Sequence, residues 1–417
     1  MVLYREWDGG EGMKHSYWIP TNRLIERCLS SYCKEVQYCQ NKYKIEIPMY
    51  IIDSGNIEIE NNNRTAISAV KKKYDDVKIT HISFEKQRDL IESILEDSEL
   101  SKAWIEYFMN TRANYGAVMN RIYVLATALG YDVIHRRDSD TLLQDNCPYP
   151  LELEIEYIAT SVSGGNSQVR VVGSGYIGEW NLDIKDLIQD DASKFNTFLD
   201  CLNIPKDNQE KYITTIYADS EKEFKSDDIL INQKTPEAGN FCIYKLFKQY
   251  PCMPANNTLG TDYFTFKMAK ALGWDILFHE RRVVHEYHAE RKNEEKKDNY
   301  FCSLLKLCDH SPVYWSLFNE FKKIKLSIDL DDEKVANVIS DILEKAKYAY
   351  LDKRKRNYDK FVNELLSPMY EAEADELKKI KMDLLEECIS DYDNHILLIR
   401  DWHTIISNAE KKQCLLV

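Results

Sequence analysis

Two aspartates two positions apart are the residues of this sequence best suited to hold a metal ion. Asp138 and Asp140 close a segment in which a short β-type run beginning at Tyr131 leads into Asp-Ser-Asp. In an extended chain, side chains at this spacing leave on the same side, so both carboxylates can share one hard cation. Mg²⁺ and Mn²⁺ prefer oxygen ligands, and Mg²⁺ usually takes one or two carboxylates plus substrate phosphate. The alternative is a solvated acidic turn.

The elements expected before this pair favour a ligand site. Four strands are predicted: a short apolar run within residues 16–23 that ends in a polar turn, and residues 45–52, 77–82 and 132–136. The second is nearly continuous, as in strands buried on both faces. Segments with apolar residues at helical spacing fill the intervals. Strands that alternate with helices predict βαβ units and a parallel sheet.

Three polar segments follow these strands and are expected to meet. They are Thr21-Asn22-Arg23, Asp53-Ser54-Gly55 and Asp138-Ser139-Asp140. Right-handed connections bring the carboxyl ends of parallel strands to one edge, and ligands of open α/β sheets bind beyond that edge. The sequence therefore predicts one site built from all three segments.

The pattern changes after residue 150. Residues 151–157 alternate apolar and charged side chains, which predicts a half-exposed strand. Residues 169–178 are predicted to be a glycine-punctuated strand, and residues 236–260 to be irregular. A helix is expected at residues 262–273, and a short strand follows it. Beyond about residue 290 the chain is predicted to be almost entirely helical, with Pro312 and Pro368 as breaks.

Composition narrows the class of protein. The 417 residues are 44% hydrophobic and 30% charged, which is typical of one large globular domain with an appendage, or of two domains. A net charge of −14 argues against a general nucleic-acid binder. The 11 cysteines lack framework spacing, so we expect reduced thiols in a cytoplasmic protein. No apolar run is long enough to predict a membrane span.

Five blocks in order resemble a known family. They are "IPTNR", "IIDSG", "NYGAVMNRIYVLATALGYDVIHRRDSD", "LGTDYFTFKMAKALGWDILFHE" and "RRVVHEYH". This order is similar to that of GT-A fold glycosyltransferases, particularly the family 2-like nucleotide-diphospho-sugar transferases. The resemblance covers roughly residues 16–290. It implies a GT-A-type, Rossmann-like α/β fold with a mostly parallel sheet flanked by helices, followed by an α-helical C-terminal appendage.

The resemblance also implies domains and an activity. Residues 1–290 would form the catalytic domain, with a nucleotide-binding half at 16–140 and an acceptor-side half at 141–290, and residues 291–417 a helical region. The activity would be metal-dependent transfer of a sugar from a nucleotide-diphosphate donor to an acceptor. We expect an inverting reaction, and the C-terminal helices are a candidate contact for a homo-oligomer.

Residue by residue, the resemblance implies these roles. Asp138 and Asp140 would hold Mn²⁺ or Mg²⁺, with His285 completing the metal site and His288 as second choice. Asp262 would be the general base. The nucleotide and its sugar would be contacted by Pro20, Thr21, Arg23, Asp53, Asn120, Arg121 and Asp138. The chain departs from the family where Arg136 and Arg137 replace apolar residues and where Asp262 is not part of an acidic pair. A Gln-x-x-Arg-Trp motif is absent, so polysaccharide synthesis is not expected.

Each role has a structural alternative. An aspartate that opens a helix, as Asp262 does, commonly acts as its N-cap. Asp53 is equally suited to capping the turn that follows it. The histidines after residue 284 are also typical of a hydrogen-bonded core or a rim. The two arginines before Asp138 suit phosphate or protein ion pairs.

Two other functions compete with glycosyl transfer. A nucleotidyltransferase shares the architecture but would carry a glycine-rich phosphate loop after the first strand, where this chain has Pro20-Thr21-Asn22-Arg23. A non-catalytic nucleotide-binding or scaffold protein would use the helical region instead. Binding of metal and nucleotide separates this last class from the enzymes.

Overall fold

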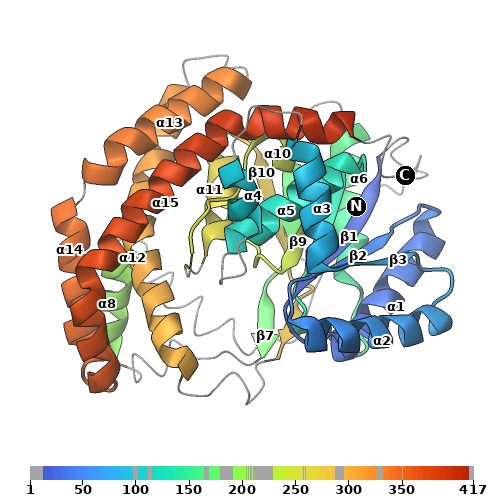
Figure 1. The fold of residues 1–417 in the computed structure, drawn as a ribbon, viewed down its shortest axis with the longest axis horizontal. Coiled ribbons are helices and arrows are strands. Elements are labelled where there is room, and N and C mark those ends of the chain that lie inside the picture. The colour runs from blue at the N-terminus through green and yellow to red at the C-terminus, as the bar shows by residue number, and fades with distance from the viewer. Residues whose placement is uncertain are drawn as a thin grey trace.

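The computed structural model is a mixed α/β fold with a large sheet and a helical C-terminal region (Figure 1). The part of the chain that it describes comprises residues 13–96, 102–109, 115–163, 169–178, 191–202, 204, 206, 209, 229–256, 258, 260–286, 295–325, 332–349 and 351–412. The large sheet has eight strands in the order β3-β2-β1-β4-β9-β6-β10-β8. The predicted fold class, a mostly parallel sheet flanked by helices with a helical C-terminal region, is confirmed.

One half of the sheet is entirely parallel. Its strands are β1 (His15–Thr21), β2 (Met49–Asp53), β3 (Ile79–Ile82) and β4 (Val133–Arg137). β1 lies between β2 and β4, with Thr21 opposite Asp53 and Trp18 opposite Arg136. The carboxyl ends of β1, β2 and β4 therefore lie along one edge, and the expected placement of Asp53 and Asp138 at the same end of the sheet is confirmed.

The other half mixes directions. β9 (Asn240–Tyr244) runs antiparallel between β4 and β6 (Val169–Gly173), β10 (Asp275–His279) is parallel to β6, and β8 (Ile229–Ile231) closes the edge. The prediction that residues 236–260 are irregular was wrong here. All five residues of β9 are buried, but five residues are too few to show a period that separates a strand from an irregular segment.

Helices cover both faces of the parallel half. They are α1 (Glu26–Tyr43), α2 (Ile57–Lys73), α3 (Phe84–Leu95), α4 (Lys102–Phe108) and α5 (Tyr115–Ala128). On one face, α1 packs Cys28, Leu29 and Tyr32 against strand residues such as Ile51, following the i, i+3, i+4 pattern of an amphipathic helix. On the other face, α5 is almost wholly buried because α15 (Glu371–Lys411) packs over it.

The strand predicted at residues 151–157 is instead α6 (Pro150–Ser163). Leu151, Glu154, Ile155 and Ile158 are buried together, which is helical spacing rather than alternation. Pro150 is the first helical residue, where its missing N–H costs nothing. The alternation misled because Glu154 is a charged residue on the buried face.

The C-terminal region consists of α12 (Glu295–Lys325), α13 (Asp332–Ala349), α14 (Leu351–Lys360), the π-helical turn η2 (Phe361–Leu366) and α15. The predicted break at Pro312 was wrong, because α12 continues through it. Pro368 does separate η2 from α15. Shorter helices elsewhere are α8 (Ala192–Cys201), α10 (Leu246–Gln249) and α11 (Thr261–Ala271).

The helical region shares a core with the sheet domain. Phe264 of α11 stacks on Tyr314 of α12 with ring centroids 4.0 Å apart. Nε1 of Trp402 donates to the carbonyl of Phe247 at 3.1 Å, and Nε1 of Trp104 donates to Asp401 at 2.7 Å. One hydrophobic cluster runs through α5, α11, α12, α13 and α15. The domain boundary near residue 290 stays a prediction, and this core crosses it.

Within the described residues, none of the helices combines the length and the apolar character needed to traverse a lipid bilayer.

Candidate functional site

A small sheet brings a histidine to the aspartate turn. Its strands are β5 (Thr141–Leu143), β11 (Val283–His285) and β7 (Tyr176–Gly178), in the order β5-β11-β7. In the β5–β11 ladder His285 lies opposite Thr141, and the N–H of Glu286 donates to the carbonyl of Asp140 at 2.8 Å. Strand register, rather than side-chain attraction, thus sets His285 beside Asp140.

The two aspartates occupy a turn and not an extended segment. The N–H of Thr141 donates to the carbonyl of Asp138 at 3.3 Å, and the Thr141 hydroxyl donates to the same oxygen at 2.8 Å. The Tyr32 hydroxyl binds the carbonyl of Thr141 at 2.7 Å. The same-side argument for an extended chain therefore does not apply, and the two carboxylates have different partners.

Asp140 lies between a histidine and an arginine. Its Oδ2 lies 3.5 Å from Nε2 of His285 and 3.7 Å from Nη1 of Arg23. Burial disfavours the charged carboxylate, but the hydrogen bond and charge of His285 and the charge of Arg23 outweigh it, so the pKa of Asp140 is lowered. Two ligands of one ion at about 2.1 Å lie roughly 3–3.5 Å apart, and a carboxylate with an imidazole suits a divalent cation. The residues present therefore fit a metal.

Asp138 is held on both carboxylate oxygens. Nη2 of Arg136 donates to Oδ1 at 2.9 Å, and the Tyr176 hydroxyl donates to Oδ2 at 2.8 Å. The side chain keeps 27% of its surface exposed. A methyl group on Gly239 would lie 2.1 Å from Cγ of Asp138, so only glycine permits this approach. Of the two alternatives for Arg136, the structure shows the ion pair.

Asp53 organises the turn after β2. Its carboxylate is fully buried; Oδ1 accepts from the N–H of Gly55 at 2.9 Å, and Oδ2 accepts from Asn63 at 2.9 Å and lies 3.1 Å from Nε2 of His81. The following helix has a different N-cap, Asn56. The turn-capping alternative is therefore present, and a direct contact of Asp53 with a nucleotide stays a prediction.

The loop after β1 places a cation at the same edge. The Thr21 hydroxyl donates to the carbonyl of Arg23 at 2.7 Å and accepts from its N–H at 3.1 Å, and Asn63 donates to the same carbonyl at 3.0 Å. Pro20, within β1, is half-buried. The Arg23 side chain is 36% exposed and points to Asp140. It can reach an anion bound beside that carboxylate.

Asn120 and Arg121 on α5 have internal partners. Asn120 accepts from the N–H of Cys252 at 2.7 Å and donates to its carbonyl at 3.0 Å, which ties α5 to the loop after α10. Arg121 donates to the carbonyl of Phe108 at 2.6 Å and to the Ser54 hydroxyl at 3.0 Å. Burial lowers the pKa of Arg121 to about 10. Of the two, Arg121 lies at the Asp53 turn, and donor contact by either stays a prediction.

The acceptor-side residues are placed only in part. Asp262 is the second residue of α11, and the N-cap of that helix is Gly260, with φ of 72°. The N-cap alternative for Asp262 was therefore wrong, while its side chain lies outside the described residues. His288 also lies outside them.

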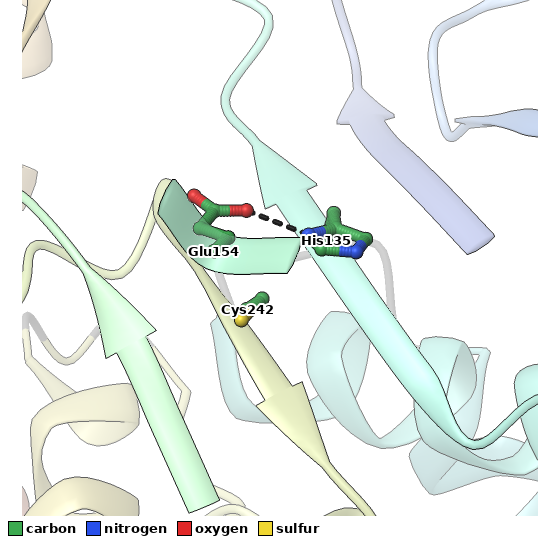
Figure 2. Close-up of side chains that lie close together, drawn as sticks. All are labelled: His135, Glu154 and Cys242. Carbon is green, nitrogen blue, oxygen red and sulfur yellow. Dashed lines mark hydrogen bonds and ion pairs between the residues drawn. The ribbon is translucent and has the colours of Figure 1, made fainter. Parts of the chain in front are cut away.

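A second cluster of ligand-type side chains lies between the central strands β4 and β9 and helix α6. His135 of β4, Glu154 of α6 and Cys242 of β9 meet there, all fully buried (Figure 2). Nδ1 of His135 lies 2.6 Å from Oε2 of Glu154. That separation fits a shared proton and is too short for two ligands of one ion, which need roughly 3–3.5 Å. Arg137 completes the network at 2.9 Å from Glu154. We interpret it as the support that fixes β4 to α6.

This network predicts a pH-dependent stability. Burial raises the pKa of Glu154 from 4.5 to about 7, although the charge of Arg137 opposes the shift. A carboxyl with a raised folded-state pKa stabilises the fold fully below pH 4.5, and this contribution disappears as the pH rises through about 7. Relative to Glu154→Gln, the wild type should lose on the order of 3 kcal/mol of unfolding free energy between pH 4.5 and 7.5.

Urea unfolding of both proteins at several pH values measures this difference. Glu156→Gln is the matched control, because Glu156 lies on the same helix with 40% of its side chain exposed. Parallel pH profiles for wild type and Glu154→Gln would show that folding does not raise the pKa of Glu154.

Comparisons with known proteins place the chain in a family. A family model, described as a family of unknown function (DUF6271), matches residues 16–416. The chain belongs to the DUF6271 family. The match runs through the sheet and the C-terminal helices of this DUF6271 protein alike. No curated protein matches it.

Several solved structures share features of its fold. Glucosyl-3-phosphoglycerate synthase from Mycobacterium tuberculosis, in complex with Mn²⁺, UDP-glucose and phosphoglyceric acid, is 12% identical with a TM-score of 0.39, over 72% of this chain and 82% of that one. The same synthase with phosphoglyceric acid is 13% identical with a TM-score of 0.40, over 74% and 86%. A structure described as a mycobacterial protein is 13% identical with a TM-score of 0.39, over 72% and 76%.

Sequence reasoning missed three residues of the site. Tyr176 and Gly239 touch Asp138, and His81 touches Asp53. Gly239 stands directly before a strand, which is a recognisable signal for close backbone approach. Tyr176 carried no signal, because its partners lie 38 and 109 positions away.

Proposed function

We propose that this protein is a metal-dependent glycosyltransferase that uses a nucleotide-diphosphate sugar. The observation that supports the proposal is the pairing of Asp140 with His285 at 3.5 Å, with Arg23 at 3.7 Å from the same carboxylate. These three side chains come from β11 and from the loops after β1 and β4. They offer a divalent cation two ligands and a diphosphate one guanidinium at the ligand-binding edge of a parallel sheet.

In this proposal each residue has a separate task. Asp140 and His285 would hold the ion, and Arg23 would bind the diphosphate. Bound there, Mn²⁺ or Mg²⁺ would act as a Lewis acid that stabilises the departing nucleotide diphosphate. Asp262 would accept the proton of the acceptor hydroxyl. The acceptor oxygen would then bond to the anomeric carbon while the bond from that carbon to the diphosphate breaks. Inversion and this use of Asp262 rest on the family resemblance.

A thermal-shift panel tests the proposal. Nucleoside diphosphates with different bases are added to the protein with Mn²⁺ or with EDTA. A ligand at 100 times its Kd stabilises the fold by about 2.7 kcal/mol, which is readily detected. We expect at least one nucleoside diphosphate to stabilise the protein only when Mn²⁺ is present.

Two outcomes count against the proposal. Stabilisation by no nucleotide in Mn²⁺ would favour the scaffold alternative. Preference for a nucleoside triphosphate, with release of pyrophosphate on adding a sugar phosphate, would favour a nucleotidyltransferase.

A further inference from the structure

We propose that Tyr176 is a positioning residue that fixes the two sides of the metal site relative to each other. This inference rests on the proposed function, because it assigns Asp140 and His285 to a cation. The Tyr176 hydroxyl donates to Oδ2 of Asp138 at 2.8 Å. The ring of the same side chain stacks on the imidazole of His285, with centroids 5.3 Å apart and planes 22° apart. One side chain thus contacts both the aspartate turn and the histidine strand.

The backbone around Tyr176 is arranged for this double contact. β7 and β11 are parallel neighbours in the small sheet, with Tyr176 opposite Val283 and Gly178 opposite His285. Tyr176 therefore lies one strand away from His285 on a fixed ladder. A methyl group on Gly239 would lie 2.2 Å from the Tyr176 hydroxyl oxygen as well as 2.1 Å from Asp138. The glycine before β9 leaves the space in which the hydroxyl and the carboxylate meet.

The contacts of Asp138 explain why such a residue is needed. Arg136 holds Oδ1 and Tyr176 holds Oδ2, whereas Asp140 faces His285 and Arg23. The turn from Asp138 to Thr141 carries Asp140, so a tether on Asp138 also limits where Asp140 can lie. The hydroxyl of Tyr176 would fix the conformation of the turn that carries Asp140, and its ring would fix the orientation of the His285 imidazole. Partners of this kind orient metal ligands, and losing one typically costs 10–100-fold in metal affinity.

Two substitutions separate the hydroxyl from the ring. Tyr176→Phe keeps the stacked ring and removes the hydrogen bond to Asp138, and Tyr176→Leu removes both contacts. Mn²⁺ alone is the probe, with its binding followed by the electron paramagnetic resonance of free Mn²⁺. We expect the Kd for Mn²⁺ to rise by about 10-fold in Tyr176→Phe and by up to about 100-fold in Tyr176→Leu. The urea midpoint of Tyr176→Phe, measured in EDTA, should stay close to that of the wild type.

The control is Tyr38→Phe. The Tyr38 hydroxyl also donates to a carboxylate, that of Glu152 at 3.1 Å, but it lies on α1 away from the metal ligands. Its loss should leave the Kd for Mn²⁺ unchanged. If the wild type binds Mn²⁺ and Tyr176→Phe binds it equally well, the positioning role is overturned while the proposed function stands. If the wild type binds no Mn²⁺, both fail. If Tyr176→Leu does not fold, the Phe variant decides.

Discussion

Asp140→Ala should abolish Mn²⁺-dependent binding of nucleoside diphosphates while leaving the fold intact. Asp140 supplies the carboxylate that His285 and Arg23 both face, so its removal deletes a metal ligand and leaves two basic groups side by side. A cation held by His285 alone would be bound weakly, and without the cation the diphosphate charge is poorly compensated. Isothermal titration of the nucleotide chosen by the thermal-shift panel, in Mn²⁺ and in EDTA, measures the effect.

Asp145→Ala is the matched control for this experiment. Asp145 is an exposed aspartate a few residues further along the chain, beyond β5. The Asp145→Ala variant should bind metal and nucleotide as the wild type does. His285→Ala should give an intermediate result, because the Asp140 carboxylate remains. Unchanged heats of nucleotide binding in Asp140→Ala would remove the metal assignment.

The ends of the strands in the parallel half were predictable from the sequence, because a long apolar run that stops at polar residues has few interpretations other than a buried strand that ends there. Met49 to Asp53 is buried at every position and ends in a carboxylate. The hydrogen-bonding partners of this Asp53 carboxylate were not predictable. Asp53 is held by Asn63 and His81, both on other elements. Patterns along the chain report burial and period, but they do not report which distant groups satisfy a buried charge.

The wrong prediction for residues 151–157 has this physical cause. Residues 151–157 were predicted to be a strand because a glutamate was expected to face solvent, yet Glu154 is fully buried between His135 and Arg137. Asn120 likewise binds the backbone of Cys252, a partner 132 positions away that no local pattern reports, and its contact with a donor nucleotide stays a prediction. A polar residue on a buried face is compensated through contacts that only the folded chain creates.

The position of Asp262 leads to the second large effect that we expect. Asp262 is the second residue of α11, after the N-cap Gly260, so it is not needed to cap the helix. α11 is held in place by its packing against α12, where Phe264 stacks on Tyr314. The family resemblance gives Asp262 the role of general base.

Asp262→Asn should therefore lower turnover by on the order of 10²-fold or more, the usual cost of losing a general base. Its Kd values for Mn²⁺ and nucleotide should match those of the wild type, because the amide has nearly the same shape and the metal ligands are untouched. Asp275→Asn, just beyond the other end of α11, is the control and should keep full turnover. The measurement is consumption of the donor sugar nucleotide with an acceptor that supports transfer. Turnover close to wild type in Asp262→Asn would place the base elsewhere or indicate a retaining reaction that uses none.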